Sequence, residues 1–462
     1  MSVKDSVYAA SPIWAQNALI SLQGALLNRV RRGSPAMVAE HAKFETLSQQ
    51  EVEAMVLHRL RETVSHARSH SAYYRETVPD DAPLRSLDDL RRLPVLEKDA
   101  LRQRTQDIRC SGLPPKLIES HTSGTTGTPI TVFYRPDDMQ YRMAAWERMW
   151  NWYGVTRHSR KVRFSGRTLF PNADENEIFW RMNHASRQMF MSSYHMTAQH
   201  LDRYLDRIQS YEPELIDGYP SSIYLLARHA LLRRKWTIRP KLVMTTAETL
   251  EDFQREVIAE AFRCPVNTQY GSSEGAPLAC EDEDGEIAVL PQTGIIEIVK
   301  PGTAEPVARG ETGEMLVTSF HTHAYPLIRY RIGDTGALDG FTRKRPGFPR
   351  LRNLAGRQED YVMSPERGPV GRLDPVFKKS PSSIRECQIV QSAEDTLELH
   401  YVPDAATFRP EHLAVVDDEI RLRCGAMTVR HVEHSSALPR GANGKLRAVI
   451  GLKTSSRETV QR

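Results

Sequence analysis

The chain contains few cysteines, and none is placed for a disulfide framework or a structural zinc site. Its 462 residues include five cysteines, scattered along the sequence without a CxxC pair or a tight Cys/His spacing. An odd and dispersed set of this kind excludes a disulfide-stapled secreted domain and a small zinc module. Because the cysteine usage fits a reducing compartment, we expect a cytoplasmic protein.

The chain also lacks a strong charge excess. Its 62 lysines and arginines against 58 aspartates and glutamates leave a net charge of +4. No block of basic residues with interleaved aromatics is present, so no nucleic acid partner is expected. A mildly basic surface that attracts a small anionic ligand is enough to account for the balance.

Long hydrophobic runs are absent. The longest apolar stretch near the N-terminus, Ala15 to Val30, is interrupted by five polar residues: Gln16, Asn17, Ser21, Gln23 and Asn28. It cannot span a bilayer, and the N-terminus has no secretory-signal layout, so no transmembrane segment is expected. A helix packed against the protein is favoured over an amphipathic helix lying on a surface.

The pattern of elements predicts an α/β fold. With 40% hydrophobic residues, the chain can build a large core. Strand and helix signals alternate over residues 161–270, and antiparallel signals from Gly285 onward indicate a distorted β-barrel or β-subdomain. We predict a large multi-subdomain α/β body at 1–355, with a helical N-terminal segment at 1–110. Residues 356–462 show a β–β–α–β pattern and are predicted to form a small, mobile α+β lid.

Two helices can be predicted in more detail. A helix over Asp137–Tyr153 carries an apolar stripe, which is typical of core and less often of the wall of a ligand pocket. A helix over Ser221–Lys235 follows Pro220 and is predicted to have Ser221 or Ser222 as its N-cap. The stripe of the first helix consists of Met139, Met143, Trp146 and Trp150.

The chain is organised around a glycine- and hydroxyl-rich loop, His121 to Ile130, which reads HTSGTTGTPI. Strand signals flank it on both sides. Glycines let the backbone approach a ligand, while N–H groups and hydroxyls can donate to phosphate oxygens. The spacing is not that of a Walker A loop, and from the loop alone a polyphosphate cradle and an ordinary polar turn are both open. The residues concerned are Thr122, Ser123, Gly124, Thr125, Thr126 and Gly127.

Four further motifs follow in order: YGSSEG at Tyr270–Gly275, RYRIGDTG at Arg329–Gly336, GRQED at Gly356–Asp360 and PRGANGK at Pro439–Lys445. Together with the loop, this set resembles the adenylate-forming superfamily of acyl-activating, AMP-binding enzymes. Within it, the chain is most similar to the phenylacetate–CoA ligase-like branch and, more narrowly, to the CapK-type proteins of polysaccharide gene clusters. The resemblance extends over nearly the whole chain.

The resemblance implies an enzyme that uses ATP and Mg²⁺ to convert a carboxylic acid into an acyl-adenylate, with release of pyrophosphate, before acyl transfer. It implies that Thr122–Gly127 binds the phosphates. Glu274 is the expected Mg²⁺ ligand, because a hard cation on phosphate oxygens prefers a carboxylate. Tyr270, followed by Gly271 and Ser272, is expected to stack on adenine. The backbone of Ala247 and Glu248 is expected on the other face of the base.

The later motifs supply the remaining roles. Asp334 is expected to accept hydrogen bonds from the ribose hydroxyls, and Arg357 to add a planar donor fork to ribose or phosphate. Asp360 stands at the expected hinge between the adenylating and transferring poses. Lys445 is the expected catalytic lysine, delivered by the lid to neutralise charge between the attacking carboxylate and the α-phosphate.

Two features leave alternatives open. The sequence after GRQED contains VGRLDPVF at 370–377, which is CapK-like, so the acceptor is either CoA or a sugar, an amine or a carrier protein. A non-catalytic scaffold in a polysaccharide assembly complex is a further alternative. Cys280, His321 and His323 follow the YGSSEG motif, where some relatives bind zinc, but they lack the full ligand set and are more often core or solvated side chains. The sequence leaves the acid and the oligomeric state open.

Overall fold

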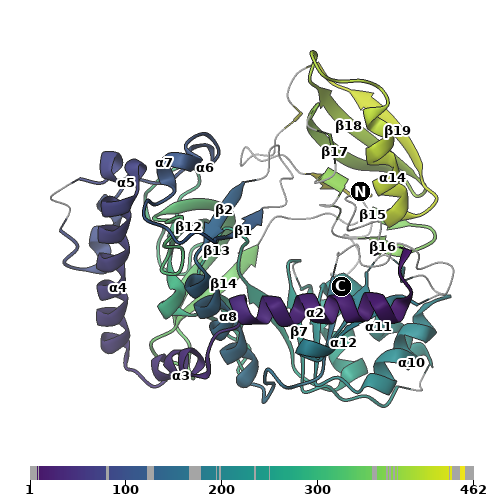
Figure 1. Cartoon of the computed structure of the whole chain (residues 1–462), viewed down its shortest axis with the longest axis horizontal. Helices are drawn as coiled ribbons and strands as arrows, with labels where there is room; N and C mark the ends of the chain where they lie inside the picture. The colour runs from purple at the N-terminus through teal and green to yellow at the C-terminus, as the bar shows by residue number, and fades with distance from the viewer. Residues whose placement is uncertain are drawn as a thin grey trace, which may run out of the picture.

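The protein is represented by a computed structural model that describes residues 8, 10–79, 83–121, 130–165, 178–193, 195–196, 199–233, 236–248, 250–355, 362–370, 373, 376–377, 380–381, 383–435, 438–439 and 448–452. Within these residues the chain forms a large α/β body and a small C-terminal α+β domain (Figure 1). The predicted fold class is therefore confirmed.

The N-terminal part of the body is helical. Its long helix α4 begins at a capping box, in which Ser48 Oγ accepts from the Glu51 N–H at 3.3 Å and Glu51 Oε2 accepts from the Ser48 N–H at 2.8 Å. The buried face of α4 packs into the main hydrophobic core with Val52, Val56 and Leu60. The elements are α2 (Ile13–Arg31), α3 (Pro35–Phe44), α4 (Gln49–His70), α5 (Ala72–Thr77), η1 (Leu87–Arg92), α6 (Lys98–Gln103) and α7 (Thr105–Ile108).

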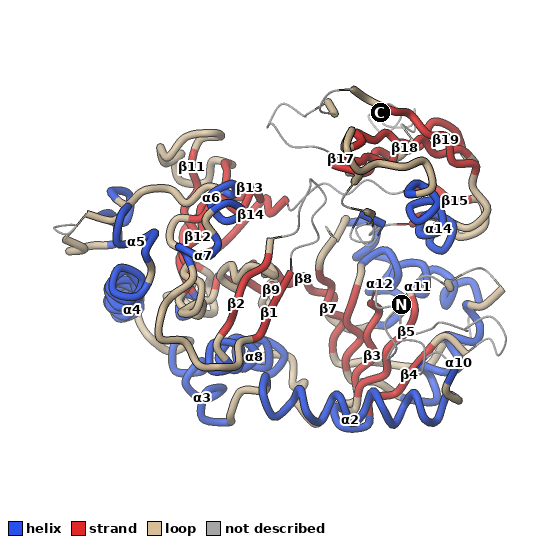
Figure 2. The backbone as a smooth tube through the Cα atoms, turned by 45° about the horizontal axis from the view of Figure 1, so that its top comes forward, coloured by secondary structure: helices blue, strands red, loops and turns tan. Residues whose placement is uncertain are grey.

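A 12-stranded sheet crosses the body in the order β11-β12-β13-β14-β10-β9-β8-β7-β6-β3-β5-β4. Its second half is parallel except for the edge strand β4, and a large apolar cluster joins these strands to α10, α11 and α12 (Figure 2). The elements of this half are β3 (Lys161–Ser165), β4 (Trp180–Asn183), η2 (His184–Ser186), β5 (Gln188–Ser192), α10 (Leu201–Tyr211), β6 (Leu215–Gly218), α11 (Pro220–Arg233), β7 (Leu242–Thr246), α12 (Asp252–Phe262) and β8 (Val266–Tyr270).

The antiparallel half of the sheet contains the predicted β-subdomain. It begins with β9, which pairs antiparallel with β8, so it extends the parallel sheet and closes no separate barrel within the described residues. Its elements are β9 (Ala279–Glu281), β10 (Ile287–Val289), η3 (Pro291–Thr293), β11 (Gly294–Val299), β12 (Gly313–Ser319), β13 (Tyr330–Phe341) and β14 (Pro349–Ala355).

The predicted strands on both sides of the glycine-rich loop are present. β1 (Ile118–His121) and β2 (Thr131–Tyr134) pair antiparallel, with His121 opposite Thr131. The loop itself, at 122–129, lies outside the described residues. Helix α8 (Pro136–Asn151) follows directly and contacts the loop between β8 and β9 through Arg142.

The apolar stripe predicted to be core lies against the core, with Met139, Trp146 and Trp150 packed on two apolar clusters, but it is only partly buried. Met139, Met143, Trp146 and Trp150 are only half-buried. The buried positions instead include three charged residues, Asp138, Arg142 and Glu147, together with Ala144, Ala145 and Met149. Small and polar side chains of α8 face the neighbouring elements. The indole rings of Trp146 and Trp150 lie against the side of an apolar cluster.

The C-terminal domain confirms the predicted β–β–α–β pattern and adds three short strands that the sequence did not reveal. Its four-stranded sheet has the order β19-β18-β17-β20, and residues from Val362 to Val449 form a hydrophobic cluster of their own. The elements are β15 (Val362–Ser364), β16 (Gly368–Val370), β17 (Ile384–Ala393), β18 (Thr396–Pro403), α14 (His412–Cys424), β19 (Thr428–Glu433) and β20 (Val449–Ile450). The boundary at 355/356 and the mobility of this domain stay predictions.

Among the described residues, no helix combines the length and the apolar character needed to cross a lipid bilayer.

Candidate functional site

The carboxyl ends of two neighbouring parallel strands, β7 and β8, define the candidate site. Their register pairs Thr246 with Gln269, so Ala247, just after β7, and Tyr270, the last residue of β8, lie at the same edge of the sheet, where α/β proteins bind ligands. Ala247 has a φ of +72°, a left-handed conformation that is uncommon for a residue with a Cβ. Residues held in such conformations cluster at ligand sites.

Tyr270 and Asp334, which were predicted to bind the two halves of a nucleoside, are in direct contact. The Tyr270 hydroxyl donates to Asp334 Oδ2 at 2.8 Å, joining the end of β8 to β13. Tyr270 is buried, and burial together with the Asp334 carboxylate raises its pKa well above the usual value. The tyrosine therefore stays protonated and remains a donor that orients the carboxylate.

Side chains from two other elements hold the loop after Tyr270 in shape by donating to its backbone carbonyls. The Tyr134 hydroxyl of β2 donates to the Ser273 carbonyl at 2.8 Å. Arg142 of α8 donates to the Ser272 carbonyl at 3.0 Å and to the Ala276 carbonyl at 2.8 Å. These contacts satisfy buried carbonyls in a segment that has left the sheet, and they fix the path of the chain between β8 and β9.

Arg142 is a buried charge that donates hydrogen bonds to neutral acceptors. Besides the two carbonyls, one of its amino groups donates to His321 Nε2 at 2.6 Å. Burial lowers the pKa of Arg142, and burial together with Arg142 lowers the pKa of His321 well below its usual value. His321 is therefore neutral, and its Nε2 accepts the hydrogen bond from Arg142.

Gly275 is required by geometry at the end of the motif. Its φ is +112°, and a Cβ at this position would lie 2.5 Å from Thr322 Cγ2 and 2.9 Å from Tyr134 Oη. Gly271 is also tightly enclosed, because its Cβ would lie 3.1 Å from Trp146 Cζ2. Both glycines let the loop pack closely against α8 and β2.

Glu274 lies between these glycine-enforced contacts and is buried, with 5% of its surface exposed. Within the described part of the chain, no hydrogen bond or ion pair to another side chain engages its carboxylate. Buried carboxylates are normally paired or bind metal ions. An oxygen ligand of this kind fits Mg²⁺, which prefers one or two carboxylates in addition to phosphate oxygens.

Glu248, the other acidic residue expected near the base, makes a structural contact through its side chain. Its carboxylate accepts from the Ser221 N–H at 3.1 Å and from Ser221 Oγ at 3.1 Å. The prediction that Ser221 or Ser222 is an N-cap is wrong, because α11 begins at Pro220 and contains both serines. Glu248 thus supplies the acceptor at this helix start that a capping serine would otherwise provide.

Cys280, His321 and His323 have separate roles. Cys280 lies in an apolar cluster, and burial raises its pKa well above the usual value. His323 Nδ1 lies 2.5 Å from Asp138 Oδ1, while His321 accepts from Arg142. Among the described residues, no group of three or more His, Cys, Asp and Glu side chains is arranged to bind a metal ion.

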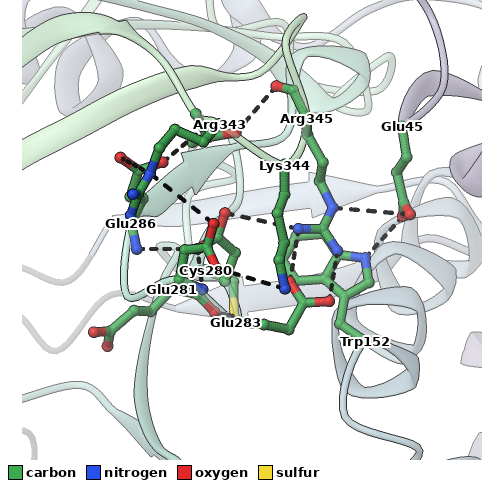
Figure 3. A network of polar contacts seen from close by, with 12 residues as sticks. Glu45, Trp152, Cys280, Glu281, Glu283, Glu286, Arg343, Lys344 and Arg345 are labelled. Atoms are coloured by element: carbon green, nitrogen blue, oxygen red, sulfur yellow. Dashed lines mark hydrogen bonds and ion pairs between the residues drawn. The ribbon is translucent and has the colours of Figure 1, made fainter.

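A network of charged side chains anchors the far end of α8 (Figure 3). The Arg345 guanidinium lies 3.7 Å from the ring centroid of Trp152 and donates to Glu283 at 2.9 Å. Glu45 accepts from Trp152 Nε1 at 2.8 Å and from Arg148 at 2.6 Å. Because Trp152 directly follows α8, this network helps to fix the helix that carries Arg142.

Several predicted site residues lie outside the described residues: Thr122, Ser123, Gly124, Thr125, Thr126, Gly127, Arg357, Asp360 and Lys445. The structure brings together Tyr270, Asp334, Glu274 and the backbone of Ala247. Sequence reasoning missed Tyr134 and Arg142. A signal for Arg142 was available in the sequence. Asp138 and Arg142 are charged residues four positions apart on a helix whose other face carries an apolar stripe.

Comparisons with known proteins agree with this arrangement. Residues 45–323, more than half of the chain, match the AMP-binding enzyme family, and residues 362–451 match the CapK C-terminal domain. Protein CapK of Staphylococcus aureus is 27% identical over 455 residues, covering 96% of this chain and 98% of that protein. The phenylacetate-coenzyme A ligase of Escherichia coli (strain K12) is 25% identical over 437 residues, covering 89% and 91%.

Among solved structures, a 2-hydroxyisobutyryl-CoA ligase in complex with 2-HIB-AMP and CoA aligns with a TM-score of 0.58. It is 20% identical and covers 89% of this chain and 91% of that chain, so the likeness concerns the fold. The strand-end site, the sheet and both family matches lead to one conclusion. The chain belongs to the AMP-binding enzyme family of adenylate-forming proteins, in the branch that contains CapK and the phenylacetate-coenzyme A ligases.

Proposed function

We propose that the protein activates a carboxylic acid with ATP, forming an acyl-adenylate and pyrophosphate, and then transfers the acyl group to an acceptor. Family membership supports the reaction class. The observation that carries the proposal is the contact of Tyr270 with Asp334 at the strand-end site, with the buried Glu274 four residues further along the same loop.

The nucleoside roles follow from this contact. The Asp334 carboxylate offers about four acceptor sites, so it can take a hydrogen bond from Tyr270 and also accept from the ribose hydroxyls. The ring of Tyr270 offers a rigid face for the adenine, opposite the backbone of Ala247. The undescribed residues Thr122–Gly127 would donate to the phosphates, and Arg357 to the ribose or phosphate.

Glu274 would hold Mg²⁺, which when bound neutralises charge on the phosphate oxygens. A carboxylate oxygen of the acid attacks the α-phosphorus, and the bond to pyrophosphate breaks. Lys445 is proposed to neutralise the charge that develops between them. In the second step a thiol, amine or hydroxyl attacks the acyl carbon and AMP leaves, after a rearrangement about Asp360.

Acid-dependent exchange of labelled pyrophosphate into ATP tests the first step over a panel of carboxylic acids. Glu274→Gln should raise the Mg²⁺ concentration needed for half-maximal exchange by at least about tenfold. Glu53→Gln, which changes an exposed glutamate of α4, is the matched control and should behave as wild type. Exchange without any acid dependence, or an unchanged Mg²⁺ requirement in Glu274→Gln, would refute the assignment.

The acceptor is a second question, and the match of residues 362–451 to the CapK C-terminal domain favours a sugar, an amine or a carrier protein over CoA. The relatives named as coenzyme A ligases favour CoA. Supplying preformed acyl-adenylate with each acceptor class in turn distinguishes them. A non-catalytic scaffold predicts no ATP binding, so a single calorimetric titration with ATP and Mg²⁺ separates it from both enzymatic proposals.

A further inference from the structure

Helix α2 is attached to the protein by its polar face. Asn17 Oδ1 accepts from the Met182 N–H at 2.8 Å, and Ser21 Oγ accepts from the His184 N–H at 3.0 Å. Near the other end, Asn28 Nδ2 donates to Ser186 Oγ at 3.0 Å. These contacts hold the helix along the edge strand β4 and the short helix η2.

The outward face of the same helix is apolar. Of the twelve large hydrophobic residues that are exposed in the described part of the chain, five lie on this helix of 19 residues. Four of them recur at spacings of three and four, which places them on one face. The exposed fractions are 74% for Trp14, 44% for Leu19, 60% for Leu22, 53% for Leu26 and 42% for Val30.

This orientation is the reverse of that in an ordinary surface helix, which buries its leucines and exposes its polar residues. The inward face contributes only a narrow line of buried residues, Gln16, Ile20 and Gly24. At Gly24 the helix lies so close to β4 that a Cβ would be 2.4 Å from Asn183 Nδ2. Among the residues that the structure describes, these leucines stay exposed, and a contiguous apolar face of this kind marks an interaction surface.

The shape and charge of the face indicate its partner. Helix α2 contains no acidic residue, and Arg29, Arg31 and Arg32 gather at its C-terminal end. The face runs for about 16 Å along the helix from Leu19 to Val30, from a rise of about 1.5 Å per residue, and Figure 2 shows α2 along the margin of the molecule with no described element outside it. A ridge of leucines with basic residues and an exposed tryptophan is typical of helices that lie in the headgroup region of anionic bilayers.

We propose that the outward face of α2 binds the surface of a lipid bilayer that contains anionic lipids, with the helix lying in the plane of the interface. The leucines enter the boundary between headgroups and acyl chains, and Arg29, which is exposed on the same side of the helix, contacts lipid phosphates. The strand-end site lies elsewhere on the body, so this surface adds a partner without contributing to catalysis.

The test is flotation of the full-length protein with vesicles of equimolar phosphatidylglycerol and phosphatidylcholine, compared with phosphatidylcholine alone. Wild type should float with the anionic vesicles. The double variant Leu22→Gln/Leu26→Gln should bind at least about tenfold more weakly, because two leucines no longer leave water. Arg29→Gln should lose about fivefold on anionic vesicles only. Leu232→Gln, which changes a still more exposed leucine on α11, is the control and should bind as wild type.

Failure of wild type to float, or equal flotation of the double leucine variant, would overturn the proposal. Light scattering on the same samples tests whether the face instead binds a second copy of the chain. A dimer that Leu22→Gln/Leu26→Gln converts to monomer would assign the face to a second copy of the chain and would also overturn it. Each variant should exchange pyrophosphate at the wild-type rate. This result would show that the variants are folded.

Discussion

Replacing Arg142 by methionine should both destabilise the protein and disturb the proposed nucleotide site. The substitution keeps an unbranched side chain on α8 but removes the donors to the Ser272 and Ala276 carbonyls and to His321. A buried acceptor left without a donor costs about 1–3 kcal/mol. The substitution also removes a buried guanidinium, whose lowered pKa reflects the cost of its desolvation. This gain offsets part of the three lost hydrogen bonds. We expect the free energy of unfolding to fall by about 3 kcal/mol.

The functional effect should go beyond stability, because the released carbonyls belong to the loop that carries Glu274. At a temperature where Arg142→Met is fully folded, the Mg²⁺ concentration for half-maximal pyrophosphate exchange should rise by about tenfold or more. Arg142→Lys, which keeps a donor, should restore part of this loss. Urea unfolding and the exchange assay, run on the same preparations, provide the two readouts.

Arg148→Gln is the matched control, since Arg148 lies on the same helix but pairs with Glu45 at its far end. It should lower stability and leave the Mg²⁺ requirement unchanged. Should Arg142→Met retain the wild-type unfolding free energy, or should both arginine variants shift the Mg²⁺ requirement equally, the positioning role assigned to Arg142 would be refuted.

Three further predictions concern single contacts. Tyr270→Phe removes the 2.8 Å hydrogen bond to Asp334 and should weaken ATP binding in calorimetry by about tenfold, whereas an unchanged affinity would argue against a nucleoside role for the pair. Gly275→Ala places a Cβ 2.5 Å from Thr322 Cγ2 at a φ of +112° and should lower the unfolding free energy by about 2 kcal/mol or more; a wild-type urea midpoint would contradict the packing described. Burial lowers the pKa of His41 from 6.5 to about 4. The contribution of neutral His41 to the free energy of unfolding is therefore fully present above about pH 6.5 and is lost as the pH falls toward 4. Between about pH 7.5 and about pH 5 this share amounts to about 2 kcal/mol, and urea melts of His41→Met should lack it; equal pH dependence in both proteins would exclude His41 as its source.

The sequence was sufficient for the features that depend on local periodicity. Alternating strands and helices predicted the α/β body, and the strands around His121–Ile130 and the C-terminal β–β–α–β pattern are present. The motif residues Tyr270 and Asp334 were predicted for one site although 64 positions separate them, and the structure places them in contact. Motif order carried this information, since spacing alone says nothing about contacts between β8 and β13.

Features that depend on tertiary contacts were missed or misread. The apolar stripe of α8 was expected to be core and does pack against the core, although it is only partly buried. Periodicity identifies an amphipathic helix without showing that a buried arginine on it will bind two loop carbonyls. Ser221 was expected to cap α11, but Glu248 from the next strand end supplies the acceptor. For Ala15–Val30 a packed helix was favoured; the helix is packed, but through its polar side.

The most direct test of the central claim is acid-dependent pyrophosphate release by wild type and Lys445→Ala, with ATP binding measured in parallel. If the body holds the nucleotide at Tyr270 and Asp334 while the C-terminal domain delivers Lys445, the variant should bind ATP as wild type does and release pyrophosphate about a hundredfold more slowly or less. Lys300→Ala, at an exposed lysine of the body, should change neither quantity. Wild-type pyrophosphate release by Lys445→Ala would contradict the account.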